Sequence, residues 1–144
     1  MADLGALIRL SKWQLDEKRK ALTALRNLHD QMVAEQERME LELAQEQRLA
    51  AADFEASLAY PGYARAVSQR RERLEISIRQ VIQQIEAAAD EMANAFQELK
   101  KFELAQEERQ RRNRQRIAKR EGEAMDEAGL AGFIRRQGED RGGA

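Results

Sequence analysis

The sequence predicts an all-α protein: a long antiparallel two-helix coiled-coil hairpin with a flexible C-terminal tail. Three observations predict this fold class. Charged residues make up 35% of the 144 residues and aromatic residues only 5%, a composition typical of long helices. Between Ala6 and Glu121 the only proline and glycine are the adjacent Pro61 and Gly62. On both sides of that dipeptide, apolar residues repeat with the heptad spacing of coiled coils.

The two predicted helices are nearly equal in length. The first covers residues 4–59 and the second covers residues 62–120, with the turn at residues 60–63. Asp3 has a side chain suited to cap the start of the first helix. Pro61 suits the first turn of the second helix, where its missing N–H removes no hydrogen bond.

The C-terminal part of the chain differs in composition. Six of the eight glycines lie between Gly122 and Gly143, and glycine is a poor helix former. The sequence therefore predicts a hairpin domain over residues 1–121 and a flexible tail over residues 122–144. Only a short helical turn is expected in the tail, around residues 125–128.

Each predicted helix carries two neighbouring stripes at heptad spacing, which together form the seam of a coiled coil. The stripes of the first helix are Ile8, Leu15, Leu22, His29, Gln36, Leu43 and Ala50, with Leu4, Ser11, Lys18, Leu25, Met32 and Met39 beside them. Those of the second helix are Ile78, Ile85, Met92 and Leu99, with Val67, Leu74, Val81, Ala88, Ala95 and Phe102 beside them.

The seams of the two helices are compatible with a hairpin that folds back at Pro61. In such a hairpin the numbers of facing residues have a constant sum. The first stripes pair at a sum of 121, as in Leu22 with Leu99. The companion stripes pair at 120, which places Lys18 opposite Phe102. This agreement favours an intramolecular antiparallel coiled coil.

The residues that most catalytic and metal sites need are missing. The chain has no cysteine and a single histidine, His29, which excludes disulfides, thiolate metal sites and sites with several histidines. No Gly-rich phosphate loop is present. The many glutamates lack a cleft that would shift their pKa values toward acid–base work. We therefore expect no enzymatic activity, no cofactor and no metal.

The sequence also bears on location and on the class of partner. No apolar run approaches the roughly 20 residues that a membrane span needs, and the N-terminus does not read as a secretory signal. We therefore expect a cytoplasmic protein. The net charge of -1 gives no support to a general nucleic-acid-binding role.

Residues 109–120 are the most basic segment of the chain. They read RQRRNRQRIAKR, with seven basic residues in twelve positions. A contact with an acidic partner, a solvated helix end and nucleic-acid binding all remain open for this segment. No aromatic residue is present in it to stack on bases.

Aromatic residues mark both ends of the predicted hairpin. Tyr60 and Tyr63 at the turn are residue types that anchor interfaces, or they cap the end of the coiled coil. At the other end, Trp13 joins Leu7 and Leu10, so the start of the first helix is apolar around much of its circumference. Apolar surface of this kind often marks an interaction site.

The chain resembles the FliJ family, the central-stalk proteins of the flagellar type III export ATPase. Residues 96–103, FQELKKFE, carry the more specific part of the resemblance, together with the arginine-rich run that follows them. Residues 123–130, EAMDEAGL, resemble the tails of family members. The resemblance covers most of the chain in length and layout.

The resemblance implies a non-enzymatic stalk that inserts its terminal ends into a hexameric flagellar export ATPase and promotes the assembly or activity of that ATPase. Such a protein would lie in the cytoplasm, at the cytoplasmic face of the inner membrane through its partners. Export chaperones are further implied partners. The ATPase-binding residues implied here are Leu4, Leu7, Ile8, Trp13, Arg109, Arg111, Arg112, Arg114 and Arg116.

The resemblance also implies contact with the export-gate membrane protein near the start of the second helix. The residues implied there are Tyr63, Val67, Arg70, Arg71 and Leu74. A bulky aromatic residue would be expected on that helix face, and Val67 takes its place.

Three other interpretations remain open at the level of sequence. The chain could be the equivalent stalk of a virulence secretion system, since such a stalk would have the same coiled-coil properties. It could be a coiled-coil chaperone for export substrates, which predicts affinity for unfolded chains. It could be a nucleic-acid-binding helix that uses residues 109–120, which predicts binding that weakens steeply with salt. The sequence also leaves open a monomer or a swapped dimer in which the turn opens.

Overall fold

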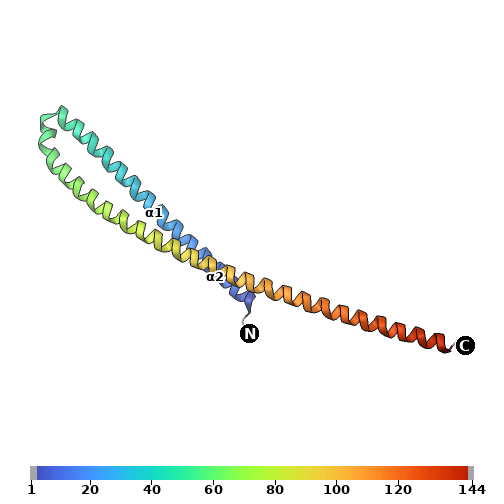
Figure 1. The fold of residues 1–144 in the computed structure, drawn as a ribbon. Helices are drawn as coiled ribbons and strands as arrows, with labels where there is room; N and C mark the ends of the chain where they lie inside the picture. The colour runs from blue at the N-terminus through green and yellow to red at the C-terminus, as the bar shows by residue number, and fades with distance from the viewer. Residues whose placement is uncertain (1–2, 143–144) are drawn as a thin grey trace. The chain divides into compact units, whose positions relative to one another are not determined.

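Two long helices make up almost all of the computed structural model, which describes residues 3–142. Helix α1 spans Leu4–Ala52 and helix α2 spans Phe54–Gly142 (Figure 1). Within residues 3–142 there is no strand, and no helix of that range is long and apolar enough to cross a membrane. The predicted all-α fold class is confirmed.

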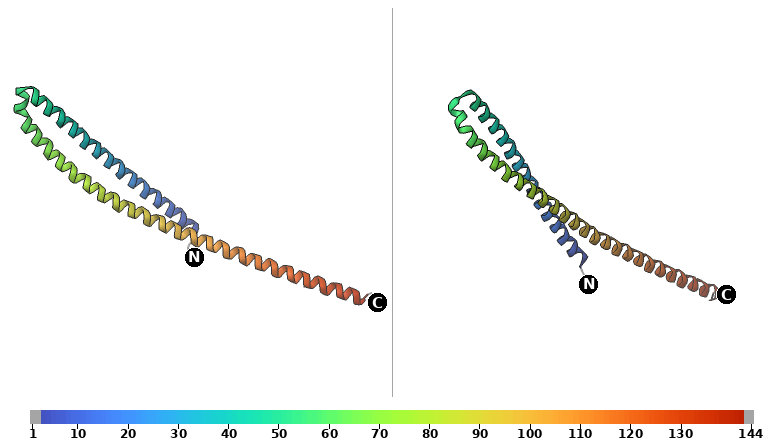
Figure 2. Two further views of the ribbon diagram at one scale, coloured as in Figure 1. Left: turned by 45° about the horizontal axis from the view of Figure 1, so that its top comes forward. Right: turned by 60° about the vertical axis from the view of Figure 1, so that its left-hand side comes forward.

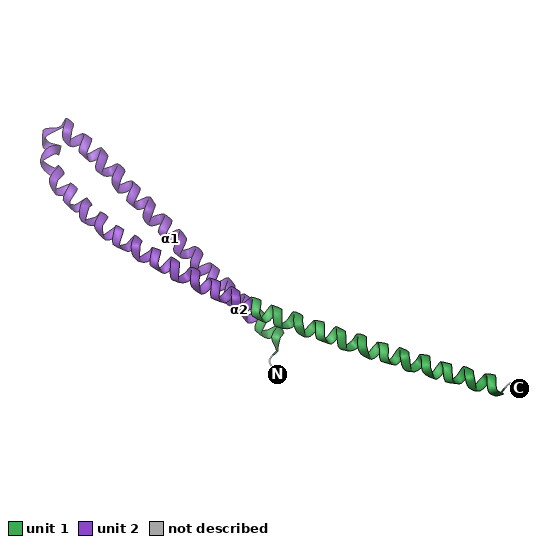
Figure 3. Ribbon diagram, viewed as in Figure 1, with its two compact units in different colours: residues 1–8, 100–144 green, residues 9–99 purple. Residues whose placement is uncertain are grey.

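The chain divides into two compact units (Figure 3). Residues 9–99 form the first, here called the hairpin unit, in which α1 lies antiparallel beside the first part of α2 (Figure 2). Residues 1–8 and 100–144 form the second, here called the terminal unit. The predicted antiparallel hairpin is therefore confirmed within the hairpin unit.

Helix α1 begins at a side-chain cap, as predicted. The Asp3 Oδ1 atom accepts hydrogen bonds from the backbone N–H groups of Gly5 at 3.0 Å and Ala6 at 3.3 Å. These N–H groups lie in the first turn of a helix and have no partner within it. The Asp3 cap therefore sets where α1 starts.

The break between the helices lies at Asp53, which corrects the turn predicted at residues 60–63. Asp53 caps α2 with its side chain, since its Oδ1 atom accepts a hydrogen bond from the N–H of Glu55 at 3.3 Å. The hydroxyl of Ser57 donates to the carbonyl oxygen of Phe54 at 2.6 Å. Aspartate is among the strongest N-caps, so α2 starts here and not at Pro61.

Pro61 lies inside α2, close to its beginning. A proline within a helix removes one backbone hydrogen bond, here the one that the carbonyl of Ser57 would accept. The first turns of α2 tolerate this loss, and the chain completes its reversal over the same stretch (Figure 1). Pro61 and Gly62 therefore belong to the reversal of the chain, but they do not end a helix.

Helix α2 also continues past the boundary predicted at Gly122. The backbone is helical through Gly129, Gly132 and Gly138, and the helix ends at Gly142. The sequence predicted a flexible tail from residue 122, whereas the structure has helix over residues 122–142. No described residue, glycine or otherwise, has a positive φ. The glycines of α2 therefore do not introduce a turn.

The predicted seam positions are the least exposed residues of the hairpin. Every seam position described above is buried or half-buried. The most deeply buried apolar members of the whole set are Ile8, Leu15, Leu22, Met39, Val67, Val81 and Leu99. Ser11, at 3% exposure, is the only buried polar residue among residues 3–142. The heptad pattern therefore identified the packed face of both helices.

The register of the two helices differs from the predicted one. Lys18 forms an ion pair with Glu91 at 2.8 Å, and Arg71 forms one with Glu40 at 2.8 Å. The residue numbers of these pairs add up to 109 and 111, not to 120 or 121. A register in which the numbers of facing residues add up to about 110 accounts for both pairs. Compared with the predicted register, each residue of α1 faces a residue of α2 that comes about ten positions earlier. At 1.5 Å per residue, one helix is therefore displaced by about 15 Å along the other.

The earlier break at Asp53 explains this shift, because a turn that comes earlier in the chain lowers the sum of facing residues. In the observed register each stripe of α1 meets the other stripe of α2. A sum of 110, for example, pairs Leu25 with Ile85 and not with Ala95. Seam positions still face seam positions, so the packed faces are as predicted while the partners across the seam are different.

The observed register brings a charged residue into the seam. Arg71 occupies a seam position between Ala64 and Ile78, and its side chain is 31% exposed. Its Nε atom is buried and has no hydrogen-bond partner among residues 3–142. The ion pair with Glu40 satisfies the outer end of the guanidinium but not Nε. Arg71 is therefore a weak point in the packing of the hairpin.

The register can be measured by disulfide crosslinking, since the chain has no cysteine of its own. The double variant Leu25→Cys/Ile85→Cys places the two thiols opposite each other in the observed register. We expect it to form an intramolecular disulfide under mild oxidation, visible as a change in gel mobility that reducing agent reverses. Leu25→Cys/Ala95→Cys is the matched control, and its preferential crosslinking would contradict the observed register.

Replacement of Arg71 tests the weak point. Arg71→Met removes the buried Nε and fills the seam with an apolar chain, so we expect the free energy of unfolding to rise by about 1 kcal/mol. Thermal unfolding followed by circular dichroism would show a Tm higher by several degrees. In the control Arg70→Met, an exposed pair at 3.7 Å from Glu35 is lost, and a change below about 0.5 kcal/mol is expected. Equal or opposite effects of the two changes would rule out this account of Arg71.

Candidate functional site

The basic segment, residues 109–120, lies on α2 in the terminal unit. All twelve of its residues are exposed. Arg114, Lys119 and Arg120 have no ion-pair or hydrogen-bond partner for their side chains within the described residues 3–142. The segment therefore presents an excess of positive charge around the circumference of one helix.

Glu108 neutralises part of this charge at the start of the segment. Its carboxylate accepts hydrogen bonds from Arg111 at 2.7 Å and from Arg112 at 3.2 Å. The hydrogen bond from Arg111 holds the pKa of Glu108 below its usual value, and the same contact raises the pKa of Arg111. Glu108 thus stays ionised and orients two of the candidate arginines on the helix surface.

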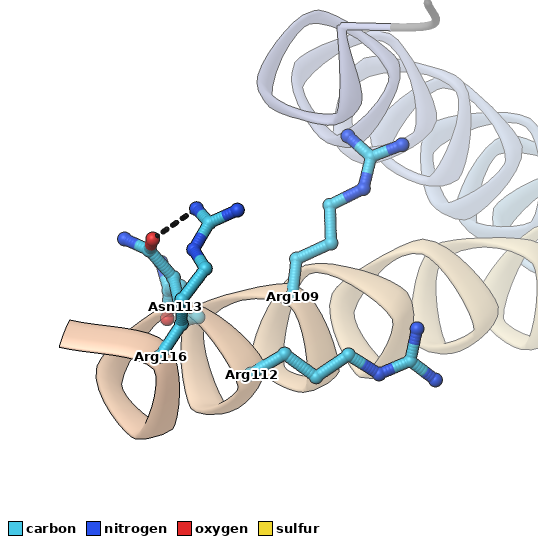
Figure 4. A pocket seen from close by; sticks show the side chains of 5 residues that line it. Arg109, Arg112, Asn113 and Arg116 are labelled. Carbon is cyan, nitrogen blue, oxygen red and sulfur yellow. Dashed lines mark hydrogen bonds between the residues drawn. The ribbon is translucent and has the colours of Figure 1, made fainter. Parts of the chain in front are cut away.

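Four side chains of the basic segment are seen at close range in Figure 4. Arg109 extends toward the first turns of α1, and Arg112 points along α2 (Figure 4). Arg116 donates a hydrogen bond to the side-chain oxygen of Asn113 at 2.7 Å (Figure 4). With Gln110 these residues line an open groove of about 550 Å³ that has no acidic residue in its wall. Such a groove suits a carboxylate or another anionic group of a partner.

The apolar residues predicted to contact the ATPase are divided by the structure. Leu4 and Leu7 are half-buried and Ile8 is only 8% exposed, all three in the terminal unit. Their side chains pack within the chain and leave little surface for a partner. Trp13, in the hairpin unit, is 61% exposed and is the more accessible anchor.

Trp13 lines an open groove of about 660 Å³ in the hairpin unit. Glu17 and Lys18 of α1 form one side of this groove, and Glu91 and Ala95 of α2 are on the other. Lys18 and Glu91 are joined across the seam by the 2.8 Å ion pair. The indole therefore lies on a surface that is mixed in charge and fixed by an interhelical contact.

The residues implied for the export-gate contact fall into two groups. Val67 is 3% exposed and Leu74 is half-buried, and both are seam positions that pack in the hairpin. Arg71 is also a seam position. Tyr63, half-buried, and Arg70, exposed, are the two members with accessible side chains outside the seam.

Tyr63 and Arg70 share an electrostatic environment with α1. Burial is the largest effect on Tyr63 and raises the pKa of its hydroxyl, and the carboxylates of Glu42 and Glu46 raise it further. Arg70 lowers it. The guanidinium of Arg70 lies 3.7 Å from a carboxylate oxygen of Glu35. The accessible part of the candidate gate surface is therefore a tyrosine and an arginine beside an acidic face of α1.

Sequence reasoning missed a set of exposed apolar residues near the end of α2. Leu130, Phe133 and Ile134 are more than half exposed. Their spacing of three and four residues is a helical signal. The sequence predicts a flexible tail for these residues, and a spacing of three and four residues indicates a common face only where the chain is helical.

Within residues 3–142 no group of three or more histidine, cysteine, aspartate or glutamate side chains could hold a metal ion. The shifted pKa values belong to exposed or half-exposed groups on the surfaces already described. The geometry supports binding to another macromolecule through charged and aromatic surface residues.

Among known proteins, the chain matches one family. No match was found among curated proteins or among solved structures. The model of one protein family, described as the flagellar FliJ protein, matches residues 1–138 and thus nearly the whole chain. The helical hairpin and its basic extension are therefore those of a component of the flagellar export apparatus, and the chain belongs to the FliJ family.

Proposed function

We propose that this protein is a non-enzymatic stalk of the flagellar type III export apparatus. Its terminal unit inserts into the hexameric export ATPase and promotes the assembly or activity of the ring, and its hairpin unit links the ring to the export gate. Membership of the FliJ family supports the setting. The exposed basic segment, residues 109–120, is the observation that carries the ATPase contact.

The physical basis of this role is a helix that makes unequal contacts inside a ring. A hexamer of identical subunits presents six equivalent surfaces around its pore. A single helix with a mixed-charge surface meets each of them differently, so it favours different conformations in different subunits. Binding energy that differs between conformations is what shifts their populations. No reaction within the inserted helix is needed.

The arrangement of the basic segment suits such a pore. Arg109, Arg112 and Arg116 line one open groove, while Arg111 and Arg114 lie elsewhere on the circumference of α2. Arginine is well suited to bind carboxylates with two parallel hydrogen bonds. A ring whose pore carries acidic side chains would therefore be contacted on several sides at once.

The hairpin unit supplies the gate contact in this proposal. Tyr63 and Arg70 are accessible and form its centre, whereas Val67 and Leu74 hold the helix face in place from within the seam. Arg71 lies between these two in the seam. The protein would act in the cytoplasm, at the inner membrane through its partners only. Export chaperones that have delivered their cargo are further candidate partners.

The ATPase contact is tested by measuring ATP hydrolysis by the purified export ATPase of the same organism while this protein is titrated in. We expect stimulation by the full chain. The triple variant Arg109→Glu/Arg112→Glu/Arg116→Glu should raise the concentration needed for half-maximal stimulation by at least about tenfold, because three charge-assisted contacts become repulsive.

A matched control keeps the change in net charge the same. Arg26, Arg65 and Arg73 are exposed arginines of the hairpin unit that belong to neither candidate surface, although Arg65 is close to Tyr63 in sequence. Their combined reversal to glutamate should leave stimulation within about twofold of the unchanged protein, since these positions are far from the basic segment in sequence. Equal losses in both triple variants would mean that net charge, and not the basic segment, drives binding.

The gate contact is tested by binding to the purified cytoplasmic part of the export-gate protein. We expect Tyr63→Ala/Arg70→Glu to weaken binding by about tenfold with little change in thermal stability, because both side chains are accessible. Val67→Ala should instead lower Tm, since it removes buried methyl groups from the seam. Unchanged binding by the double variant would exclude Tyr63 and Arg70 from the contact.

A further inference from the structure

The first part of α1 carries an exposed apolar stripe in addition to its seam. At 100° per residue, an arc of about 80° over residues 10–28 contains six residues and no others. We call them the outer stripe: Leu10, Trp13, Glu17, Ala21, Ala24 and Leu28. All six are exposed, and five of them are apolar. The seam residues of the same stretch are centred about 120° away, so the hairpin does not bury the outer stripe.

The large members of the outer stripe are well exposed and lie toward its two ends. Trp13 is 61%, Leu10 is 50% and Leu28 is 39% exposed. Ala21 and Ala24 lie between Trp13 and Leu28, and their small side chains allow another helix to approach α1 closely. From Leu10 to Leu28 the helix rises by about 27 Å, or about five turns. A stripe of this length and period matches the apolar face of an amphipathic helix.

The groove of about 660 Å³ in the hairpin unit determines which charge a partner must carry. Glu17 of the outer stripe lines this groove, together with Glu91 and Glu98 of α2. Among the described residues Lys18 is the only basic one in its wall, and Glu91 holds the Lys18 ammonium at 2.8 Å. Lys20, outside the wall, lies 3.3 Å from Glu17, and both of these side chains are exposed. The wall of the groove therefore has an excess of negative charge.

An indole beside carboxylates is a combination that binds cations. The face of a tryptophan ring attracts a guanidinium or ammonium group through its quadrupole. Carboxylates attract the same groups by charge, and an arginine binds a carboxylate with two parallel hydrogen bonds. Tryptophan is also enriched among the few residues that dominate the energy of protein interfaces. The groove beside Trp13 therefore favours a positively charged side chain of a partner.

We propose that the outer stripe and its groove bind an amphipathic helix of a partner protein, and that the apolar face of this helix carries one arginine or lysine. The apolar residues of the bound helix pack on Leu10, Trp13 and Leu28. Its cation lies over the Trp13 indole, beside the carboxylates of Glu17 and Glu98.

This partner differs in charge from the one that the basic segment, residues 109–120, fits. That segment suits acidic groups, which the carboxylates beside Trp13 would repel. The resemblance implied Trp13 as an ATPase contact together with the arginines, whereas the charge of the groove assigns Trp13 to a separate, basic binding segment. Binding of this helix is therefore independent of the ATPase contact, and the two surfaces can be tested separately.

The charge preference is tested with two synthetic helical peptides labelled with fluorescein. Both have leucines at three- and four-residue spacing on one face, and the central residue of that face is arginine in one peptide and glutamate in the other. We expect fluorescence anisotropy to show that the full chain binds the arginine peptide at least about tenfold more tightly. Equal binding of the two peptides, or no binding of the arginine peptide up to millimolar concentration, would overturn the proposal.

Reversal of one charge in the chain identifies the groove. Glu17→Lys should invert the preference, so that the glutamate peptide becomes the tighter ligand. Glu17 is exposed and its pair with Lys20 is on the surface, so the fold should be retained, as circular dichroism would show. Glu37→Lys is the matched control, because Glu37 is an exposed glutamate of α1 on the opposite side of the helix. A retained preference in Glu17→Lys, or an inversion in the control, would contradict the assigned groove.

The emission of Trp13 reports on its own surface, since the chain has one tryptophan. We expect an unlabelled arginine peptide without aromatic residues to shift this emission to shorter wavelength, because the bound helix removes the indole from water. Trp13→Ala should weaken binding of the labelled peptide by at least about tenfold. Phe54→Ala removes an aromatic ring that is 77% exposed elsewhere in the hairpin unit, and binding should stay within about twofold. Unshifted emission at saturation, or equal losses in both variants, would exclude Trp13 from the contact and overturn the proposal.

Sedimentation equilibrium of the chain without peptide distinguishes a second copy from a partner helix. We expect Trp13→Ala to leave the mean mass of the chain unchanged over the concentrations used in the peptide titrations. Self-association that Trp13→Ala abolishes would mean that a second copy covers the outer stripe, and it would overturn the proposal.

Discussion

The seam between α1 and α2 is the interaction on which the rest of the structure depends. A two-helix hairpin has no third layer, so nearly all of the apolar burial in the hairpin unit occurs along this single line. Its buried apolar members are spaced at heptads on both helices. Because there is only one seam, all other surfaces of the two helices are exposed. A helix that buries one stripe presents the remainder of its circumference to solvent. The recognition surfaces are therefore a direct result of how narrow the core is.

The sequence predicted this seam but not its register, and the reason is physical. Heptad stripes repeat, so one helix can slide along the other and still bring apolar positions face to face. Leu25 meets an apolar residue whether it faces Ala95 or Ile85. The position of the turn selects among these registers, and here a capping aspartate, Asp53, outweighs the Pro61-Gly62 dipeptide that the composition emphasised. Periodicity fixed the faces of the helices, while a single local hydrogen-bonding residue fixed the alignment.

The same distinction explains how far the candidate site could be predicted. The basic segment was evident from composition, because a run of arginines on a polar helix has nowhere to be buried. The apolar candidates were less certain, because an apolar side chain near a helix end can belong either to the core or to an interface. Ile8 and Val67 proved to be core residues, whereas Trp13 is exposed. Leu130 and Phe133 lie beyond Gly122, where the glycine content predicts a flexible tail and therefore no helix face.

Glycine and charge act on different parts of this molecule, and together they separate stability from recognition. The hairpin unit holds its apolar residues in a seam and balances charge with pairs such as Lys18 with Glu91. The helix beyond it has glycines instead of a seam, and its charges are sorted into blocks that Glu108 neutralises only in part. Within each block the neighbouring charges carry the same sign, so the attraction open to them is to a charge outside the block, such as one on another molecule. The part of the chain that is least able to stabilise itself is thus the part best suited to bind something else.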